Sequence, residues 1–245
     1  GGVLGDRYRI RSHLGSGGMG EVWLAFDLKL RVEVALKALR PEFFKSERRL
    51  ELLRQEVRAA REVMSPNVCR IFDLIEIDGR ELVSMEYVDG ATLLAVLHER
   101  GPLDLKEAQD IASQFLAGLE AIHKVGLVHR DIKPANILFQ LARRGTVDSY
   151  PSAGGSPLPP AEIVAADERI LISDLGIAKD LLKRASTATV VGGTPLYQSP
   201  EQVDPTAEIT PAADVYAATA MLLHALTGEP PPAVSGVRDR LAGLP

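Results

Sequence analysis

Cysteine is nearly absent, because Cys69 is the single cysteine among 245 residues. An internal disulfide needs two cysteines, so the fold does not depend on a disulfide framework. This composition also favours a reducing compartment. Cys69 lies in an apolar stretch, and we interpret it as a buried packing residue.

The chain also lacks an excess of basic charge and a long apolar run. A formal net charge of −5 gives no general attraction to nucleic acid or to an anionic membrane surface. The longest uncharged stretch near the end, residues 215–228, is too short to cross a bilayer and contains His224. Residues 1–11 are glycine-rich and then charged, which does not resemble a signal peptide. We therefore expect no nucleic-acid partner and no membrane segment in this sequence.

What remains is the composition of an ordinary soluble globular protein, with 46% hydrophobic and 25% charged residues. The length fits one large domain or two packed lobes. No methionine begins the sequence, and we expect a piece of a longer polypeptide. We expect it in the cytoplasm, either free or as the cytoplasmic part of a membrane-anchored protein.

The hydrophobic pattern divides the chain into a strand-rich part and a helix-rich part. Short apolar and aromatic runs predict strands at 8–14, 21–26, 32–39, 68–77 and 81–88. Helical spacing predicts a helix from Leu50 to Met64, with Ser46 as its N-cap. A further helix is predicted over 108–122, with Leu116 on its apolar face and Gly126 at its end. Another is predicted over 212–226; it is apolar on nearly all sides, so we expect it to be buried. Strands followed by helices predict an α+β fold.

One segment shows no sustained period. Residues 140–168 contain four prolines and the run Ala153-Gly154-Gly155-Ser156. We interpret this segment as an inserted flexible loop.

The first chemical motif is Leu14-Gly15-Ser16-Gly17-Gly18-Met19-Gly20-Glu21-Val22, which contains G-x-G-x-x-G-x-V. Glycines let the backbone approach phosphate oxygens and offer N–H donors without obstruction. A dinucleotide-binding loop has the same glycines but requires a helix directly after the third one. Here residues 21–25 predict a strand, which disfavours that alternative.

Lys37 and Glu56 form the second candidate pair. Lys37 ends a predicted strand, and Glu56 faces the apolar side of the predicted helix. A carboxylate in that position needs a cationic partner to offset its desolvation. Lys37 would provide this partner and hold its ammonium group ready for the α- and β-phosphates of a nucleotide. The alternative is that both side chains are simply solvated.

Three further motifs carry a resemblance to a known family. Residues 129–136 read His-Arg-Asp-Ile-Lys-Pro-Ala-Asn, residues 174–176 read Asp-Leu-Gly, and residues 193–201 read Gly-Thr-Pro-Leu-Tyr-Gln-Ser-Pro-Glu. In this order they resemble the catalytic loop, the metal-binding motif and the end of the activation segment of eukaryotic-like protein kinases. The residues of these motifs are most similar to those of bacterial serine/threonine protein kinases. The resemblance covers the whole chain except the insertion.

The resemblance implies a two-lobed protein-kinase-like fold over residues 1–245. A small antiparallel β-rich N-lobe with one key helix would occupy residues 1–87. A mainly helical C-lobe would occupy residues 88–245, with the insertion at about 140–168. Few residues follow the last predicted helix, so the C-lobe is expected to be shorter than is usual in the family.

The resemblance also implies a serine/threonine protein kinase that uses ATP and Mg²⁺ and acts on a protein substrate. Asp131 would accept the proton of the substrate hydroxyl, and Lys133 would place positive charge near the γ-phosphate. Asn136 and Asp174 would bind Mg²⁺. Thr194 would contact the substrate peptide and, together with Lys133, points to serine or threonine acceptors.

The same resemblance assigns the nucleotide-binding residues. The glycine-rich residues 14–20 and Lys37 would contact the phosphates. Val22, Ala35 and Leu138 would enclose the adenine, with Met85 beside it. Glu86 and Val88 would offer main-chain hydrogen bonds to the base.

Four questions stay open at this point. A phosphate on Ser186, Thr187 or Thr189 would pair with Arg130 and order that loop, which predicts autophosphorylation; a dimer through the kinase lobes is also an expectation. A nucleotide-binding pseudokinase or scaffold is the first alternative, although the motif residues named above are intact. A small-molecule phosphotransferase is the second, and the peptide-positioning residues 193–201 disfavour it.

Overall fold

The computed structural model describes residues 2–41, 44–140, 168–176, 195–204 and 206–231. Its strands are β1 (Val3–Leu4), β2 (Tyr8–Gly17), β3 (Gly20–Asp27), β4 (Val32–Leu39), β5 (Ile71–Ile77), β6 (Arg80–Glu86), β7 (Gly90–Thr92), β8 (Ile137–Gln140) and β9 (Arg169–Ile172). Its helices are α1 (Glu47–Arg61), α2 (Leu93–Arg100), α3 (Leu105–Lys124), α5 (Pro200–Val203) and α6 (Pro211–Thr227), with short 3₁₀ turns at Pro134–Asn136 and Pro195–Tyr197.

The first part of the chain forms a six-stranded antiparallel sheet in the order β1-β2-β3-β4-β6-β5. Successive side chains of a strand point to opposite faces, and β4 follows this rule. Val34 and Leu36 pack into a small cluster on one face, whereas Ala35 and Leu39 join the main hydrophobic core on the other. Lys37 is two residues from Ala35 and therefore lies on the core side of the sheet.

Helix α1 begins where its sequence predicts. Ser46 is the N-cap, and its Oγ accepts a hydrogen bond from the Arg49 N–H at 3.4 Å. The buried face consists of Leu53, Val57 and Ala60. Met64 was predicted to continue this face and is 74% exposed, because the helix ends at Arg61.

The two long helices form the centre of the second part. A capping box between Asp104 and Glu107 starts α3, whose buried residues are Ala108, Ile111, Phe115, Gly118, Leu119 and Ile122. Leu116 was predicted on that face but is 51% exposed, because it is turned by about 100° from Phe115. Helix α6 is mostly buried, yet Val215 is 56% exposed, so the prediction that nearly all its sides are covered is wrong in part.

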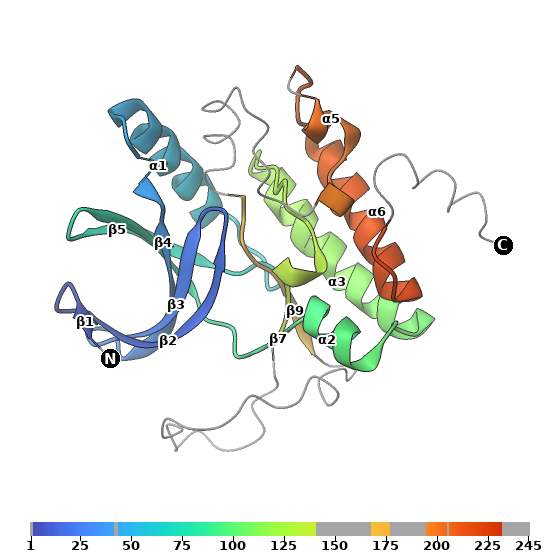
Figure 1. The fold of residues 1–245 in the computed structure, drawn as a ribbon, viewed down its shortest axis with the longest axis horizontal. Coiled ribbons are helices and arrows are strands. Elements are labelled where there is room, and N and C mark those ends of the chain that lie inside the picture. Colours follow the sequence, from blue (N-terminus) through green and yellow to red (C-terminus); the bar gives the residue numbers. More distant parts are fainter. Residues whose placement is uncertain (1, 42–43, 141–167, 177–194, 205, 232–245) are drawn as a thin grey trace.

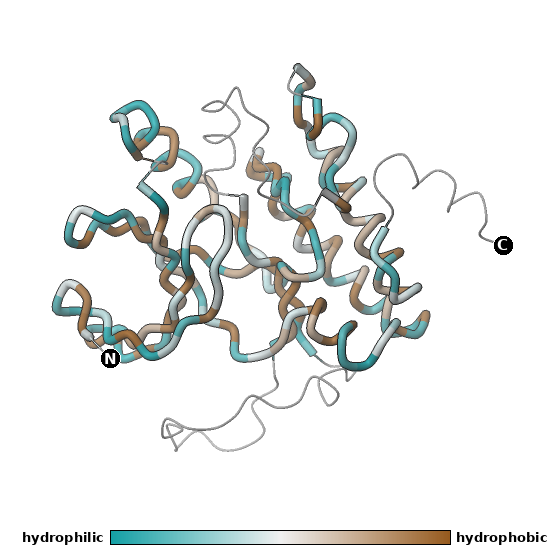
Figure 2. Tube along the Cα trace, in the orientation of Figure 1, coloured by the Kyte–Doolittle hydropathy of each residue, from teal (hydrophilic) through white to brown (hydrophobic). Residues whose placement is uncertain are grey.

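Figure 1 shows the large sheet and α1 on one side and α2, α3, α5 and α6 on the other, with the three-stranded sheet β7-β8-β9 near their junction. One hydrophobic cluster runs through both parts and includes Met85 of β6, Phe115 of α3 and Met221 of α6. In Figure 2 hydrophobic colours follow the strands and the helices where they meet, and hydrophilic colours mark many of the turns. The predicted α+β class is confirmed.

Two further predictions concern a membrane segment and the insertion. Within the described residues, no helix is long and apolar enough to span a bilayer. The predicted insertion lies outside the described residues, apart from Gln140 and Glu168 at its ends.

Candidate active site

The loop of residues 129–136, called the catalytic loop below, is held in place by a buried carboxylate of α6. Asp214 is fully buried, near the start of that helix. Its Oδ2 accepts hydrogen bonds from the His129 N–H at 2.7 Å and from the His123 ring at 2.8 Å. Its Oδ1 accepts from the Arg130 N–H at 2.7 Å. These charge-assisted bonds offset the desolvation of the carboxylate and fix the loop to the core.

The ring of His129 connects the catalytic loop to the segment that carries Asp174. The ring is 1% exposed, and its Nε2 lies 2.9 Å from the main-chain oxygen of Ser173, whereas its Nδ1 lies 3.2 Å from the Asp131 N–H. The carbonyl can only accept and the amide can only donate. The neutral tautomer with hydrogen on Nε2 therefore satisfies both partners.

Around Asp131, two side chains orient the carboxylate. Lys133 Nζ donates to Asp131 Oδ2 at 2.9 Å. The Asn136 amide nitrogen donates to the same oxygen at 3.1 Å and to the Asp131 main-chain oxygen at 2.8 Å. Three of the predicted site residues are thus brought into direct contact. A small hollow beside them is lined by Arg130, Asp131, Lys133, Tyr197, Gln198 and Gln202, among others.

Asp174 lies beside this cluster because Ser173 is tied to Asn136. The Ser173 N–H donates to the Asn136 main-chain oxygen at 2.9 Å, and the Lys37 ammonium group of β4 forms an ion pair with Asp174. Burial acts to raise the pKa of the Asp174 carboxyl, but the Lys37 charge outweighs it, so this pKa lies below its ordinary value. Asp174 is therefore an anion at neutral pH.

Asn136 and Asp174 present the ligand types that Mg²⁺ prefers. The amide nitrogen of Asn136 is used by Asp131, so its amide oxygen is the atom oriented to act as a ligand. Among the described residues, no group of three or more His, Cys, Asp or Glu is placed to hold a metal. This pair fits an ion that keeps several waters and shares its coordination with phosphate oxygens.

The glycine-rich segment, residues 14–20, comprises the end of β2, the two-residue turn Gly18–Met19 and the first residue of β3, so it joins two strands as the sequence predicts. Leu14, Ser16, Gly17 and Gly18 are exposed, and Gly17 pairs with Gly20 across the turn. A Cβ on Gly20 would lie 1.8 Å from the main-chain oxygen of Ala38, whereas Gly15 and Gly17 have no atom within 4 Å of that position. Of these three glycines, Gly20 alone is required by packing within the protein itself.

Met19 differs from its neighbours, because its side chain is buried and joins the main core. Its Sδ lies 3.7 Å from the Lys37 Nζ. The tip of the turn is therefore packed against the lysine that was predicted to bind phosphates.

The predicted adenine-binding residues come from neighbouring strands. Ala35 pairs with Met85, and Val22 pairs with Lys37; directly opposed residues share one face of a sheet. Leu138 pairs with Leu171 in the small sheet. Ala35 and Met85 are buried, and Val22 and Leu138 are half-buried.

Glu86 and Val88, which were predicted to bind the base through the main chain, lie where β6 ends, and both are half-buried. The Glu86 main-chain oxygen accepts a hydrogen bond from the Cys69 thiol at 3.2 Å. Burial raises the pKa of Cys69 to about 12, so the thiol keeps its proton. Cys69 is 3% exposed, which confirms the prediction that it packs inside.

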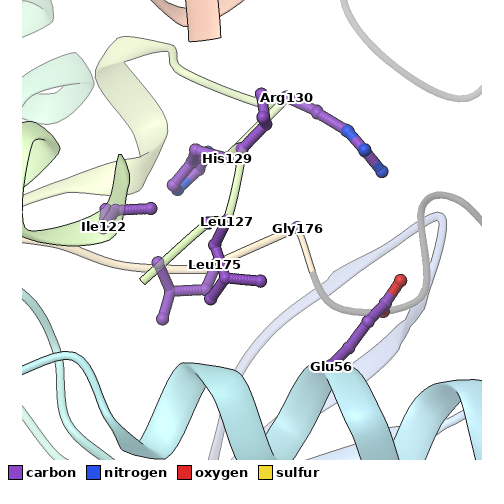
Figure 3. A pocket seen from close by; sticks show the side chains of 9 residues that line it. Glu56, Ile122, Leu127, His129, Arg130, Leu175 and Gly176 are labelled. Carbon is purple, nitrogen blue, oxygen red and sulfur yellow. The ribbon is translucent and has the colours of Figure 1, made fainter. Parts of the chain in front are cut away.

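Glu56 lies on α1 beside a cavity of about 140 Å³ that is also lined by His129, Arg130, Leu175 and Gly176. Figure 3 shows Glu56 rising from α1 on the side of this cavity opposite His129 and Arg130. Because Lys37 pairs with Asp174, the predicted pairing of Lys37 with Glu56 stays a prediction. Thr194 and the three candidate phosphorylation sites Ser186, Thr187 and Thr189 lie outside the described residues.

Sequence reasoning missed the residues that hold the catalytic loop and the segment beside it against α6. Asp214 and His123 were not singled out, and neither was the pair formed by the Tyr197 hydroxyl and His224 Nδ1 at 2.6 Å. The signal for Asp214 was present, because an acidic residue in a helix predicted to be buried needs donors around it. No local pattern identified which donors these would be.

Comparison with known proteins agrees with this geometry. The protein kinase domain model matches residues 8–240. The chain belongs to the protein kinase domain family. Serine/threonine-protein kinase PknB of Mycobacterium leprae is 33% identical over 235 residues, which cover 93% of this chain and 33% of PknB. A probable serine/threonine-protein kinase of Corynebacterium efficiens, CE0033, is 35% identical over 94% of this chain and 32% of its own length.

The kinase chain thus spans about a third of the length of these curated relatives. A crystal structure of the Mycobacterium tuberculosis PknI kinase domain superposes with a TM-score of 0.66 at 26% identity, covering 99% of this chain and 86% of that one. The predicted kinase-like α+β fold and the bacterial serine/threonine type are confirmed. The position of the lobe boundary after residue 87 stays a prediction.

Proposed function

We propose that this kinase domain transfers the γ-phosphate of ATP to serine or threonine hydroxyls of proteins with the help of Mg²⁺. The observation that carries the proposal is the contact of Asp131 with both Lys133 and Asn136, next to the Lys37–Asp174 pair. A proton acceptor, a cation and two oxygen ligands are thereby gathered on one side of a hydrophobic core. This set suits phosphoryl transfer, which depends on positioning and charge neutralisation.

In this mechanism Asp131 orients the acceptor hydroxyl and takes its proton as the oxygen attacks the γ-phosphate. Lys133 holds Asp131 Oδ2 and places a positive charge where negative charge develops on the transferred group. The hollow formed with Tyr197 and Gln198 is the proposed position of the acceptor side chain. Asp214 accepts hydrogen bonds from the N–H groups of His129 and Arg130, and the His129 ring accepts one from the Asp131 N–H. These bonds keep the loop in this geometry.

The nucleotide would lie between the glycine-rich segment and the small sheet. Val22, Ala35, Met85 and Leu138 would surround the adenine, and Glu86 and Val88 would bind it through main-chain groups. Lys37 would contact the α- and β-phosphates after Met19 moves away from it, and main-chain N–H groups of residues 15–18 would bind phosphate oxygens. Asn136 and Asp174 would hold Mg²⁺, which neutralises phosphate charge when bound.

The acceptor type is proposed on two grounds. Lys133 matches the serine/threonine form of the catalytic loop, and the relatives named above are serine/threonine-protein kinases. Thr194 is proposed to contact the substrate peptide. We also propose autophosphorylation within residues 186–189, a location in the cytoplasm and a dimer through the kinase lobes. Peptide mapping after incubation with ATP checks the first of these.

The test is transfer of label from γ-labelled ATP, with Mg²⁺, to a mixture of serine, threonine and tyrosine peptides. We expect label on serine and threonine. Asp131→Asn is expected to lower kcat by about 10²- to 10⁴-fold, since it removes the proton acceptor, while ATP affinity stays within about twofold of the parent. Asp110→Asn, a change at an exposed position of α3, is the control and should keep full activity.

Two outcomes would contradict the proposal. If the parent binds ATP but transfers no phosphate, the nucleotide-binding scaffold is the better description. If Asp131→Asn transfers phosphate at the parent rate, Asp131 is not the acceptor of the proton.

A further inference from the structure

Arg169 is the first residue of β9, and it joins three segments that are distant in sequence. Across the small sheet it pairs with Gln140, the last residue of β8. The two residues bracket residues 141–167, so Arg169 and Gln140 together form the foot of the predicted insertion. No motif of the kinase resemblance includes Arg169.

The guanidinium group of Arg169 has a partner in each segment. Its Nε donates to the main-chain oxygen of Pro66, in the stretch after α1. Its Nη1 donates to Gln140 Oε1 at 3.0 Å and to Glu86 Oε1 at 3.2 Å. The Arg169 side chain is 36% exposed and that of Glu86 is 22% exposed, so this ion pair is partly withdrawn from water.

The partner of this ion pair is also a residue of the proposed adenine site. Glu86 Oε2 accepts from the Arg70 N–H at 3.2 Å, and the Glu86 N–H donates to the Arg70 oxygen at 2.8 Å. Together with the Cys69 thiol on its main-chain oxygen, these contacts hold both main-chain groups of Glu86. The orientation of Glu86 therefore depends on its side chain as well as on the strand.

Residues 66–70 lie between β9 and Glu86 and complete the connection. Ile172 of β9 donates its N–H to the Asn67 oxygen at 2.9 Å and accepts the Cys69 N–H at 2.8 Å. The same stretch forms a parallel bridge between Val68 and Ile172. A shift at the start of β9 thus reaches Glu86 by two routes, one through the guanidinium group and one through this stretch.

We propose that Arg169 is a positioning residue for the nucleotide, which acts through the carboxylate of Glu86 and couples the foot of the insertion to ATP affinity. This inference rests on the proposed function, because it requires Glu86 to face the adenine. An arginine suits the role, since its planar fork binds several oxygens in fixed directions, which a lysine does not do. Without it, the Glu86 carboxylate loses its cation and turns toward water, and the peptide that binds the base turns with it.

The test measures the dissociation constant of ATP by calorimetry for the parent, Arg169→Gln, Arg169→Lys, Glu86→Gln and the double variant Arg169→Gln/Glu86→Gln. We expect Arg169→Gln and Glu86→Gln each to weaken binding by about fivefold, the range of a partly exposed charged pair. Arg169→Lys should recover part of the loss. The double variant should be no weaker than either single one, because both remove the same interaction. With a peptide substrate, KM for ATP should rise and kcat at saturating ATP should stay the same.

Arg100→Gln is the matched control. Arg100 forms an ion pair with Glu107 at 2.8 Å, and these side chains are 28% and 20% exposed, which is close to the burial of the Arg169–Glu86 pair. The control pair links α2 to α3, outside the proposed adenine site, so its loss should leave the ATP dissociation constant unchanged. A similar loss of affinity in Arg100→Gln would assign the effect to general destabilisation and overturn the proposal.

The remaining outcomes are also decisive. If the parent itself does not bind ATP, the proposed function fails, whatever the variants do. If the parent binds and both Arg169→Gln and Glu86→Gln bind equally well, the positioning role of Arg169 is refuted and the proposed function stands. Losses that add in the double variant would show that Arg169 does not act through Glu86. If Arg169→Gln does not fold, Glu86→Gln decides alone, because it keeps the Arg169 contacts to Pro66 and Gln140.

Discussion

The catalytic loop and the glycine-rich segment both face the proposed reaction, but they are held in different ways. No residue of the catalytic loop is exposed, and its main chain is bound by Asp214 and by the N–H of Ser173. In the glycine-rich segment, Ser16, Gly17 and Gly18 are exposed. The Gly17 oxygen there accepts a hydrogen bond from the exposed Arg40 side chain at 3.1 Å.

The difference shows which part of the site the protein completes by itself. The proposed proton acceptor must stand in one place for every substrate, and its loop is anchored to the buried Asp214 of α6. The glycine-rich segment, which we propose binds phosphate, instead needs main-chain N–H groups that a ligand can reach from solvent. The first loop therefore gains its order from folding, and the second is expected to gain it from the nucleotide.

The largest effect is expected for Asp214→Asn, which weakens the hydrogen bonds that hold the catalytic loop to α6. An amide places a donor where the carboxylate accepted from a backbone N–H, so one buried N–H of His129 or Arg130 loses its partner. We expect a loss of about 3 kcal/mol in the free energy of unfolding, together with a strong loss of phosphoryl transfer. Urea denaturation and peptide phosphorylation measure the two. Unchanged values for both would show that α6 does not order the loop.

The next largest effect distinguishes Gly20 from Gly17, which pair with each other across the turn between β2 and β3. Gly20→Ala would place a Cβ against the Ala38 oxygen, at a φ of +151°, so β3 must move away from β4. We expect a cost of about 2 kcal/mol in folding. Gly17→Ala should fold within about 0.5 kcal/mol of the parent but bind ATP less tightly, since its methyl group would meet the phosphates.

Calorimetric melting and ATP titration of both glycine variants measure these effects. The interpretation is wrong if Gly17→Ala melts well below the parent. It is also wrong if Gly17→Ala binds ATP normally.

A smaller effect concerns the buried pair of Tyr197 and His224, which ties the segment beside the catalytic loop to α6. Burial raises the pKa of Tyr197 to about 12, so its hydroxyl stays a donor, and burial lowers the pKa of His224, which favours the neutral acceptor. A histidine with a lowered folded pKa stabilises above its unfolded pKa of about 6.5, and this contribution is lost as pH falls below that value.

His224→Gln is expected to cost about 1 kcal/mol at pH 7 and to flatten the decline of stability between about pH 6.5 and 5. Denaturation at several pH values measures both. The same slope in parent and variant over this range would show that His224 does not titrate as described.

The smallest expected effect on stability is that of Lys37→Met in the proposed nucleotide site. The lowered pKa of Asp174 stabilises the fold above the unfolded value of about 3.9, and this contribution is lost as pH falls through the folded pKa. Because the Asp174 side chain is 36% exposed, we expect a change below about 1 kcal/mol at pH 7.

In Lys37→Met, burial acts on Asp174 without the cation, so its pKa should rise and the variant should lose stability as pH increases from about 3 to 5. Acid denaturation and the NMR titration of Asp174 measure this. A pKa of Asp174 equal to that of the parent would show that Lys37 does not hold it.

The sequence identified most of the residues that the structure gathers at the candidate site, because each lies in a short motif. The glycine turn, Lys37 on its strand, Asp131 with Asn136, and the Asp174 motif could all be found locally. The supports could not be found in this way, since Asp214 holds main-chain groups more than 80 residues away and Arg169 joins segments before and after the insertion. The side-chain partner of Lys37 also depends on tertiary packing, 137 residues along the chain, which no local pattern reports.

The most direct test of the comparison is amide hydrogen exchange, followed by NMR at single residues with and without ATP and Mg²⁺. We expect the amides of His129 and Arg130 to be strongly protected in the protein alone and to change little on addition of nucleotide. The amides of residues 15–18, at the end of the β2–β3 hairpin, should exchange much faster than those two and gain most of their protection with nucleotide. Rapid exchange of His129 and Arg130 in the protein alone would contradict the account, because the catalytic loop would then also depend on the nucleotide for its order.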